Sequence, residues 1–174
     1  MRIIGGDFKG RKIDQPDIEQ TRPVSDRAKE AIFNVLGDIE GLKVLDLYAG
    51  SGALALESIS RGAETATAVD ASAQASQIIQ DNANTLGIDP RVSVVHAPVG
   101  RWLMQVGASF DLVFADPPFD AFDQTEFASI SSNMSGGGTF VLKHHRRTDP
   151  PEIEGLTLQF SRRYASTEVS FYKK

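Results

Sequence analysis

Short apolar segments alternate with amphipathic segments through most of the chain. Four mostly apolar runs predict buried strands, at residues 43–48, 65–70, 92–97 and 110–115. Around them, apolar residues recur at the three- and four-residue spacing of a helix face. The predicted helices are residues 25–37, 53–61, 75–86, a short one around Trp102, and one near residues 126–132. Apolar strands that alternate with helices are typical of a parallel sheet covered on both faces.

The two ends of the chain have a different pattern. Residues 1–15 predict a short β-hairpin with glycines at its turn or bulge positions. Later in the chain, the three glycines at 136–138 predict a turn that leads into a strand at 139–143. Residues 156–164 and 167–172 alternate apolar and polar side chains, which favours an antiparallel pair of strands at a sheet edge.

With 174 residues, the chain has the length of one domain. We therefore predict a single α/β domain, residues 1–174, with a doubly wound, mostly parallel seven-stranded sheet. Residues 41–174 would form its core, and residues 1–40 a basic N-terminal extension made of the hairpin and the first helix. The antiparallel pair would close the sheet.

Composition excludes several kinds of site. Cysteine is absent, which excludes disulfides and thiolate metal ligands. The three histidines, His96, His144 and His145, do not have the spacing of zinc ligands, and we expect no bound metal. No apolar run approaches the roughly 18 residues of a membrane span, and the first residues do not resemble a signal peptide. We expect a monomeric, cytoplasmic protein.

The net charge of −5 argues against a nucleic-acid partner, because such partners are bound through their phosphates. The distribution of charge leaves the question open. Residues 143–147 form one basic cluster and residues 173–174 close the chain with two lysines. The first twelve residues also carry four cations against a single acid, and these cations are Arg2, Lys9, Arg11 and Lys12. Such clusters are either a basic binding edge or an ordinary solvated surface.

A glycine-rich turn follows the strand at residues 43–48. Gly50 and Gly52 allow positive φ and let a ligand approach the backbone closely. Asp70 ends the next strand, twenty residues after Gly50, where a carboxylate can bind two ribose hydroxyls. Together with Ala55, this pattern also satisfies the dinucleotide fingerprint, so a nicotinamide-dependent dehydrogenase is one alternative. A tight turn without a ligand is another.

Asp46 distinguishes a dehydrogenase, whose ligand carries phosphates, from an enzyme whose ligand is cationic. A carboxylate near the end of an apolar strand costs free energy unless it has partners. It would repel the phosphates of a dinucleotide, whereas a ligand with an ammonium and a sulfonium centre would be attracted. The alternative is a structural role, in which Asp46 accepts hydrogen bonds from the amides of the turn.

A second candidate site is Asp116-Pro117-Pro118-Phe119, directly after the strand at 110–115. Ligands of open α/β sheets lie beyond the carboxyl ends of the strands, so this segment faces the same crevice as the glycine turn. Asp116 and the carbonyl of Pro117 are acceptors for an amino group, and Phe119 offers a flat surface to a planar base. Such acceptors can turn a delocalised amine nitrogen toward a methyl donor. A rigid loop with a helix-capping Asp116 is the alternative.

These motifs resemble the class I, Rossmann-like S-adenosylmethionine methyltransferases that modify amino nitrogens. Residues 1–6 (Met-Arg-Ile-Ile-Gly-Gly), 9–11 (Lys-Gly-Arg) and 21–27 (Thr-Arg-Pro-Val-Ser-Asp-Arg) narrow the resemblance. They are similar to the bacterial 16S ribosomal RNA guanine-N2 methyltransferase family, the RsmD type, as is the ending at 164–172. The resemblance implies methyl transfer from S-adenosyl-L-methionine to a guanine of 16S ribosomal RNA, either naked or in a 30S assembly particle.

The resemblance also implies roles for individual residues. Asp116, Pro117, Pro118 and Phe119 would hold the target base. An RNA-facing N-terminal extension would contribute Arg2, Lys9, Arg11, Lys12, Arg22 and Arg27. The cofactor site would consist of Asp46, Ala49, Gly50, Gly52, Asp70, Ala71, Ala97 and Pro98.

Pro98 departs from the family pattern. Relatives usually carry an acid there, near the adenine of the cofactor, and proline cannot accept the adenine amine through its side chain. Backbone groups of Ala97 or Val99 could substitute, or the cofactor affinity could be lower. A non-catalytic RNA-binding or ribosome-assembly module is therefore an alternative. So are a methyltransferase for an adenine amine or a protein amide and, least favoured, an NAD(P)-dependent oxidoreductase.

Overall fold

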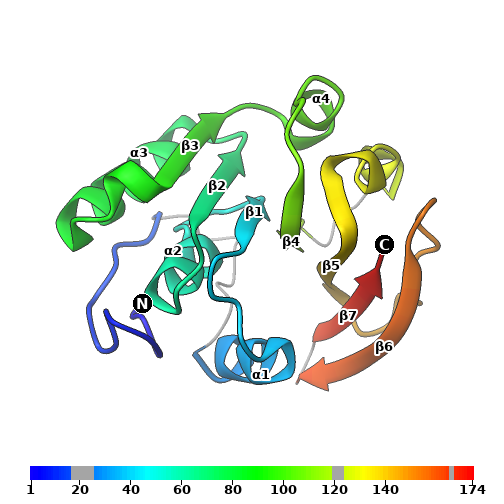
Figure 1. The fold of residues 1–174 in the computed structure, drawn as a ribbon, viewed down its shortest axis with the longest axis horizontal. Coiled ribbons are helices and arrows are strands. Elements are labelled where there is room, and N and C mark those ends of the chain that lie inside the picture. The colour runs from blue at the N-terminus through cyan, green and yellow to red at the C-terminus, as the bar shows by residue number, and fades with distance from the viewer. Residues whose placement is uncertain (17–25, 119–123, 165–166) are drawn as a thin grey trace.

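A seven-stranded sheet forms the centre of the molecule (Figure 1). The computed structural model describes residues 1–16, 26–118, 124–164 and 167–174. The sheet order is β3-β2-β1-β4-β5-β7-β6, in which β1 to β5 are parallel and β7 is antiparallel to both of its neighbours. This confirms the predicted fold class. The strands are β1 Lys43–Leu47, β2 Thr65–Asp70, β3 Val92–His96, β4 Phe110–Ala115, β5 Met134–His145, β6 Thr157–Tyr164 and β7 Thr167–Lys173.

Four α-helices and three short 3-10 helices are described along with the strands. None of the helices in the described part of the chain is both long and apolar enough to cross a membrane. The α-helices are α1 Asp26–Leu36, α2 Ala53–Ser60, α3 Ala73–Leu86 and α4 Val99–Leu103, and the 3-10 helices are η1 Asp89–Arg91, η3 Gln124–Phe127 and η4 Ser131–Asn133.

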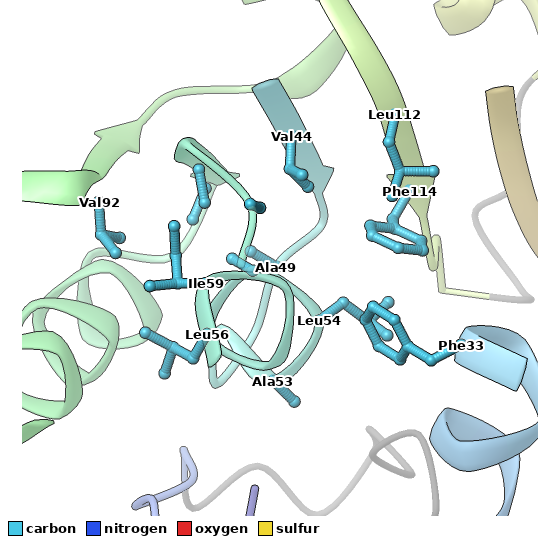
Figure 2. Close-up of a cluster of buried hydrophobic side chains, with 14 of the residues drawn as sticks. Phe33, Val44, Ala49, Ala53, Leu54, Leu56, Ile59, Val92, Leu112 and Phe114 are labelled. Atoms are coloured by element: carbon cyan, nitrogen blue, oxygen red, sulfur yellow. The ribbon is translucent and has the colours of Figure 1, made fainter. Parts of the chain in front are cut away.

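Each face of the sheet is covered by its own apolar cluster, because successive strand residues point to opposite faces. Val44 packs with α1, α2 and α3 in the first cluster, which Figure 2 shows with Phe33 of α1 directed toward Phe114 of β4. Their rings are 5.8 Å apart. Leu45, the next residue along β1, packs with α4 and η3 in the second cluster. Helices on both faces leave the carboxyl edge of the parallel strands for a site.

Buried charges tie α1 to α2. The side chains of Lys29 and Glu57 are fully buried, with 3.7 Å between Nζ and Oε2. Burial lowers the pKa of Lys29, and the charges of Glu57 and Asp26 oppose that shift. Arg61 approaches Glu57 to 2.8 Å, and its guanidinium lies 4.6 Å from the centre of the Phe33 ring. These contacts fix the N-terminal helix against the core.

The N-terminal segment forms a shorter version of the predicted hairpin. Its two arms meet in one antiparallel bridge between Arg2 and Lys12, and the N–H groups of Ile3 and Ile13 donate to the carbonyls of Arg11 and Met1 at 2.9 and 3.0 Å. The pairing stays short because other backbone groups of the segment bind side chains of α2. The N–H of Ile4 donates to Glu57 Oε2 at 2.8 Å, and the N–H of Phe8 donates to Ser60 Oγ at 3.0 Å.

Two predictions, one of a helix and one of a turn, were wrong. Residues 126–132 do not form an α-helix, because η3 and η4 occupy that stretch as short 3-10 helices. Residues 136–138 do not form a turn between elements either, since they lie inside β5 where its register with β4 shifts. A Cβ at Gly138 would lie 2.9 Å from the carbonyl oxygen of Ser135, so this irregularity of the strand requires glycine.

Candidate active site

The glycine turn between β1 and α2 has one face against protein and one face open. Gly50 and Gly52 have φ of 56° and 73°, and the N–H of Gly52 donates to the carbonyl of Ala49 at 2.7 Å. A Cβ at Gly52 would lie 3.0 Å from Ile79 Cγ2, whereas one at Gly50 would meet no atom within 4 Å. At Gly52 the absence of a side chain therefore allows close packing against Ile79 of α3. At Gly50 it leaves the backbone accessible to a ligand.

Asp70 closes β2 beside this turn. Its Oδ2 accepts the N–H of Gly50 at 2.8 Å, and its Oδ1 accepts the N–H of Ser72 at 2.8 Å. Two backbone donors therefore orient the carboxylate, and each oxygen keeps a further lone pair for a ligand. The exposed Ala71 follows, and its carbonyl lies 3.1 Å from His96 Nε2.

Asp46 is 1% exposed and lies on β1 beneath the turn. Its Oδ2 accepts the N–H of Ala55 at 3.0 Å, in the first turn of α2, so the structural role considered from sequence is present. Burial raises its pKa well above 3.8; the bond from Ala55 opposes the shift, and the charges of Asp116 and Asp70 add to it. A nearby cation would relieve this cost.

Asp116 follows β4 and is paired with a lysine. Lys143 of β5 lies with Nζ 2.7 Å from Asp116 Oδ2. Burial raises the pKa of Asp116, and Lys143 opposes that shift through its charge and hydrogen bond. Pro117 is buried and Pro118 is exposed, while Phe119 lies outside the described residues.

Lys143 and Tyr48 are members of this neighbourhood that were not predicted. Lys143 was grouped with a basic cluster, and its place at the end of a predicted strand points to Asp116 only once β4 and β5 are known to be neighbours. Tyr48 has a φ of 58°, which is rare for a residue other than glycine. Its hydroxyl donates to Glu126 of η3, so it joins the glycine turn to the segment that follows residues 119–123.

Three carboxylates thus meet at the carboxyl edge of three adjacent strands. Asp70 belongs to β2 and Asp46 to β1, and Asp116 follows β4. Among the described residues, no three acidic or histidine side chains form a group that could hold a metal ion. The arrangement attracts an organic cation and repels a phosphate, because within the described part of the chain only Asp116 of the three is paired with a cation.

The structure also shows which groups remain available in the predicted adenine-binding part of the cofactor site. The N–H of Ala97 donates to the carbonyl of Asp70 at 3.0 Å, which extends the pairing of β2 with β3. That N–H is therefore already used. Pro98 is the N-cap residue of α4 and its side chain makes no capping hydrogen bond.

Two of the N-terminal cations, Lys9 and Arg11, lie away from these carboxylates. The turn that precedes Lys9 contacts Ser60, at the far end of α2, and Arg11 donates to the carbonyl of Thr85, near the end of α3. An eight-residue helix separates Ser60 from the carboxyl edge by about 12 Å. Figure 1 shows the N-terminal segment on the opposite side of the molecule from β6 and β7.

The remaining predicted RNA-binding residues are distributed over this end of the chain. Arg2 forms an ion pair with Asp26 at 3.0 Å, and Lys12 and Arg27 are exposed. Arg22 lies outside the described residues. The structure therefore does not bring Lys9 and Arg11 together with Asp116.

Comparison with known proteins gives a consistent result. The family model described as conserved hypothetical protein 95 matches residues 1–173. The chain is 33% identical to the putative rRNA methyltransferase YlbH of Bacillus subtilis over 182 residues, which cover 100% of this chain and 99% of that protein. It is 42% identical to ribosomal RNA small subunit methyltransferase D of Escherichia coli over 120 residues, which cover 68% of this chain and 60% of that protein.

A solved structure has nearly the same fold over the whole chain. The putative methyltransferase yhhF from Escherichia coli superimposes with a TM-score of 0.90 and 30% sequence identity. The match covers 100% of this chain and 97% of that one.

Proposed function

Because the chain belongs to the RsmD-type family of class I methyltransferases, we propose that it methylates the N2 amine of a guanine in small-subunit ribosomal RNA. S-adenosylmethionine supplies the electrophilic methyl group. The observation that carries the proposal is the set of three carboxylates at the ends of adjacent strands, in which Asp46 interacts with both Asp70 and Asp116 and Asp70 binds the open Gly50 turn. Relatives named as ribosomal RNA methyltransferases support the RNA substrate.

The cofactor-binding residues fit the donor groups of this ligand. The oriented carboxylate of Asp70 binds the ribose hydroxyls, and the open backbone at Gly50 accommodates the methionine portion. Asp46 offers its charge to the ammonium and sulfonium centres. A dinucleotide would instead place its pyrophosphate beside Asp46 and Asp70, which disfavours the oxidoreductase alternative.

Asp116 acts on the amine. Lys143 holds Oδ2, which leaves Oδ1 and the carbonyl of Pro117 to accept the two N–H groups of the substrate. This grip turns the nitrogen lone pair toward the methyl group and stabilises the charge that develops on nitrogen. In the step, the bond from nitrogen to the methyl carbon would form as the carbon–sulfur bond breaks, the demethylated cofactor would leave as a neutral thioether, and the nitrogen would then lose its proton to water. An adenine amine or a protein amide could use the same acceptors, so the methylated product identifies the substrate.

The choice of cofactor is tested by titration calorimetry. S-adenosylmethionine and its demethylated product should both bind, and NAD and NADP should give no heat, since the buried carboxylates repel a pyrophosphate. A dinucleotide that binds more tightly than S-adenosylmethionine would overturn the proposal. No binding of either ligand would favour a non-catalytic assembly module.

Asn82 of α3 provides a second test, because it links the N-terminal segment to the glycine turn. Its buried amide donates to the carbonyls of Asp14 and Ser51 at 3.0 and 3.2 Å and accepts the N–H of Asp14 at 2.8 Å. We expect Asn82→Ala to weaken cofactor binding by about 1 kcal/mol, the scale of one hydrogen bond.

Asn133 is the matched control for that experiment. It is also buried and its amide donates to two carbonyls, those of Leu103 and Ser129, away from the turn. Both alanine variants should lower the unfolding free energy by about 1–3 kcal/mol, because polar groups are left unpaired. Only Asn82→Ala should change cofactor affinity; equal affinities in the two variants would show that Asn82 does not position the turn.

Pro98→Asp tests whether a side chain at position 98 can bind the adenine of the cofactor. A carboxylate at the N-cap of α4 should raise the unfolding free energy by about 1 kcal/mol. If it also accepts the adenine amine, the affinity for S-adenosylmethionine should rise by about 1 kcal/mol. Melting experiments and calorimetry separate the two effects. A stabler protein with unchanged affinity would mean that other groups already satisfy the adenine.

A further inference from the structure

One face of the sheet carries a row of side chains that leads away from Asp116. Strand β7 pairs with β5 on one side and β6 on the other, so Val169 lies opposite both Lys143 and Arg162. Residues directly opposite one another point to the same face. Val169 belongs to the apolar cluster under α1, which places Lys143 and Arg162 on that face.

The next row on the same face is aromatic. Phe171 lies opposite Phe160, and their rings are stacked with centres 4.9 Å apart. The guanidinium of Arg162 lies 5.5 Å from the centre of the Phe160 ring. Phe160 is 40% exposed, which is unusual for a phenylalanine that also packs against the core.

The row begins at the candidate active site. Lys143 contacts Asp116, and two strand spacings of about 4.8 Å put the backbone of Arg162 about 10 Å farther along the sheet. The described residues give Arg162 no carboxylate partner, whereas the neighbouring Arg163 is paired with Glu168. An exposed arginine next to an exposed ring suits a single nucleic-acid strand, since the arginine binds a phosphate and the ring stacks on a base.

We infer that Arg162 and Phe160 bind the nucleotide next to the target guanine in a single-stranded part of the RNA. This inference rests on the proposed function. Arg162 holds its phosphate, and Phe160 stacks on its base. Among the described residues, Lys143 of β5 and Arg162 of β6 then supply cations on this face, and the N-terminal cations Lys9 and Arg11 lie too far away to position the target. An RNA contact on this face also fits a chain of net charge −5, because the attraction is local.

The test measures the binding of a short, labelled single-stranded RNA at several salt concentrations. Arg162→Gln should weaken binding and make the slope of log affinity against log salt shallower by about 0.7, the share of one phosphate contact. Phe160→Leu keeps an apolar side chain beside Phe171 but removes the ring. It should weaken binding by about fivefold to 150-fold, the scale of one lost stack, with little change in slope.

Two variants serve as matched controls. Lys43→Gln removes an exposed cation at the amino end of the central strand β1, and Leu158→Ala removes a side chain of β6 with 44% exposure but no ring. Both should bind RNA like the parent protein. Unchanged RNA affinity in folded Arg162→Gln and Phe160→Leu, or losses equal to those of the controls, would overturn the inference.

Activity assays separate this inference from the proposed function. If the parent protein methylates neither RNA nor assembly particles, the proposed function fails. If the parent protein is active and both variants methylate naked RNA at the parental rate but fail on particles, this face contacts a ribosomal protein and the inference is wrong. Cofactor affinity, measured in parallel, should be the same in all variants.

Discussion

Asp116→Ala is expected to slow methyl transfer by a few hundredfold, a loss of about 3–4 kcal/mol in the barrier, while cofactor binding changes little. The carboxylate is a preorganised acceptor for the reacting amine, and its removal leaves the nitrogen free to rotate. Asp116→Asn should be less damaging, because the amide oxygen still accepts one hydrogen bond.

Single-turnover transfer at saturating cofactor separates the chemical step from binding. Removal of Asp116 also takes a paired carboxylate away from the partly buried Lys143, so thermal unfolding must be measured alongside. Asp111→Ala is the control, since Asp111 lies near the other end of the same strand and its carboxylate accepts the N–H of Lys43 at 2.9 Å. Transfer by Asp116→Ala at the parental rate would make Asp116 a structural residue.

Asp46→Asn is expected to weaken the binding of S-adenosylmethionine by about 1.5–3 kcal/mol, the scale of a hydrogen bond to a charged group. It should also abolish a pH dependence of binding. Burial holds the pKa of Asp46 above 3.8, and the neighbouring carboxylates of Asp70 and Asp116 add to the shift. A cationic ligand favours the ionised form, so binding to the parent protein releases a proton below the raised pKa and becomes tighter as pH rises toward it.

The raised pKa of Asp46 has the opposite effect on the stability of the ligand-free protein, which falls as pH rises. A carboxyl whose pKa is raised by folding stabilises the protein most at acid pH, and its contribution declines as pH rises above 3.8. Calorimetry in buffers of different ionisation enthalpy counts the protons released on binding. Equal proton release and equal affinity in the parent and in Asp46→Asn would remove Asp46 from the cofactor site.

The sequence was sufficient for the elements whose boundaries depend on local chemistry. Strands β2 and β4 were predicted to the residue, because each is a mostly apolar run that begins and ends beside polar residues. Helix α3 ends at Gly87 in the left-handed conformation, as its sequence indicated. The glycines at 136–138 misled, since glycine is as useful in a β-bulge as in a turn.

Contacts between distant segments could not be predicted in the same way. Lys143 and Asp116 are 27 residues apart, and their pairing requires that β4 and β5 be neighbours. The row that includes Arg162 exists only because β7 lies between β5 and β6. Conversely, the position of Lys9 is determined by Ser60 of α2, and nothing in the basic pattern of the first residues indicates that contact.

The central claim is tested most directly by the product of the reaction. The protein is incubated with methyl-labelled S-adenosylmethionine and small-subunit ribosomal RNA, as naked transcript and as assembly particles, and the RNA is digested to nucleosides. The account predicts label in N2-methylguanosine with at least one of the two substrates, and its loss in Asp116→Ala. Label in a methyladenosine alone, or in no nucleoside from either substrate, would contradict it.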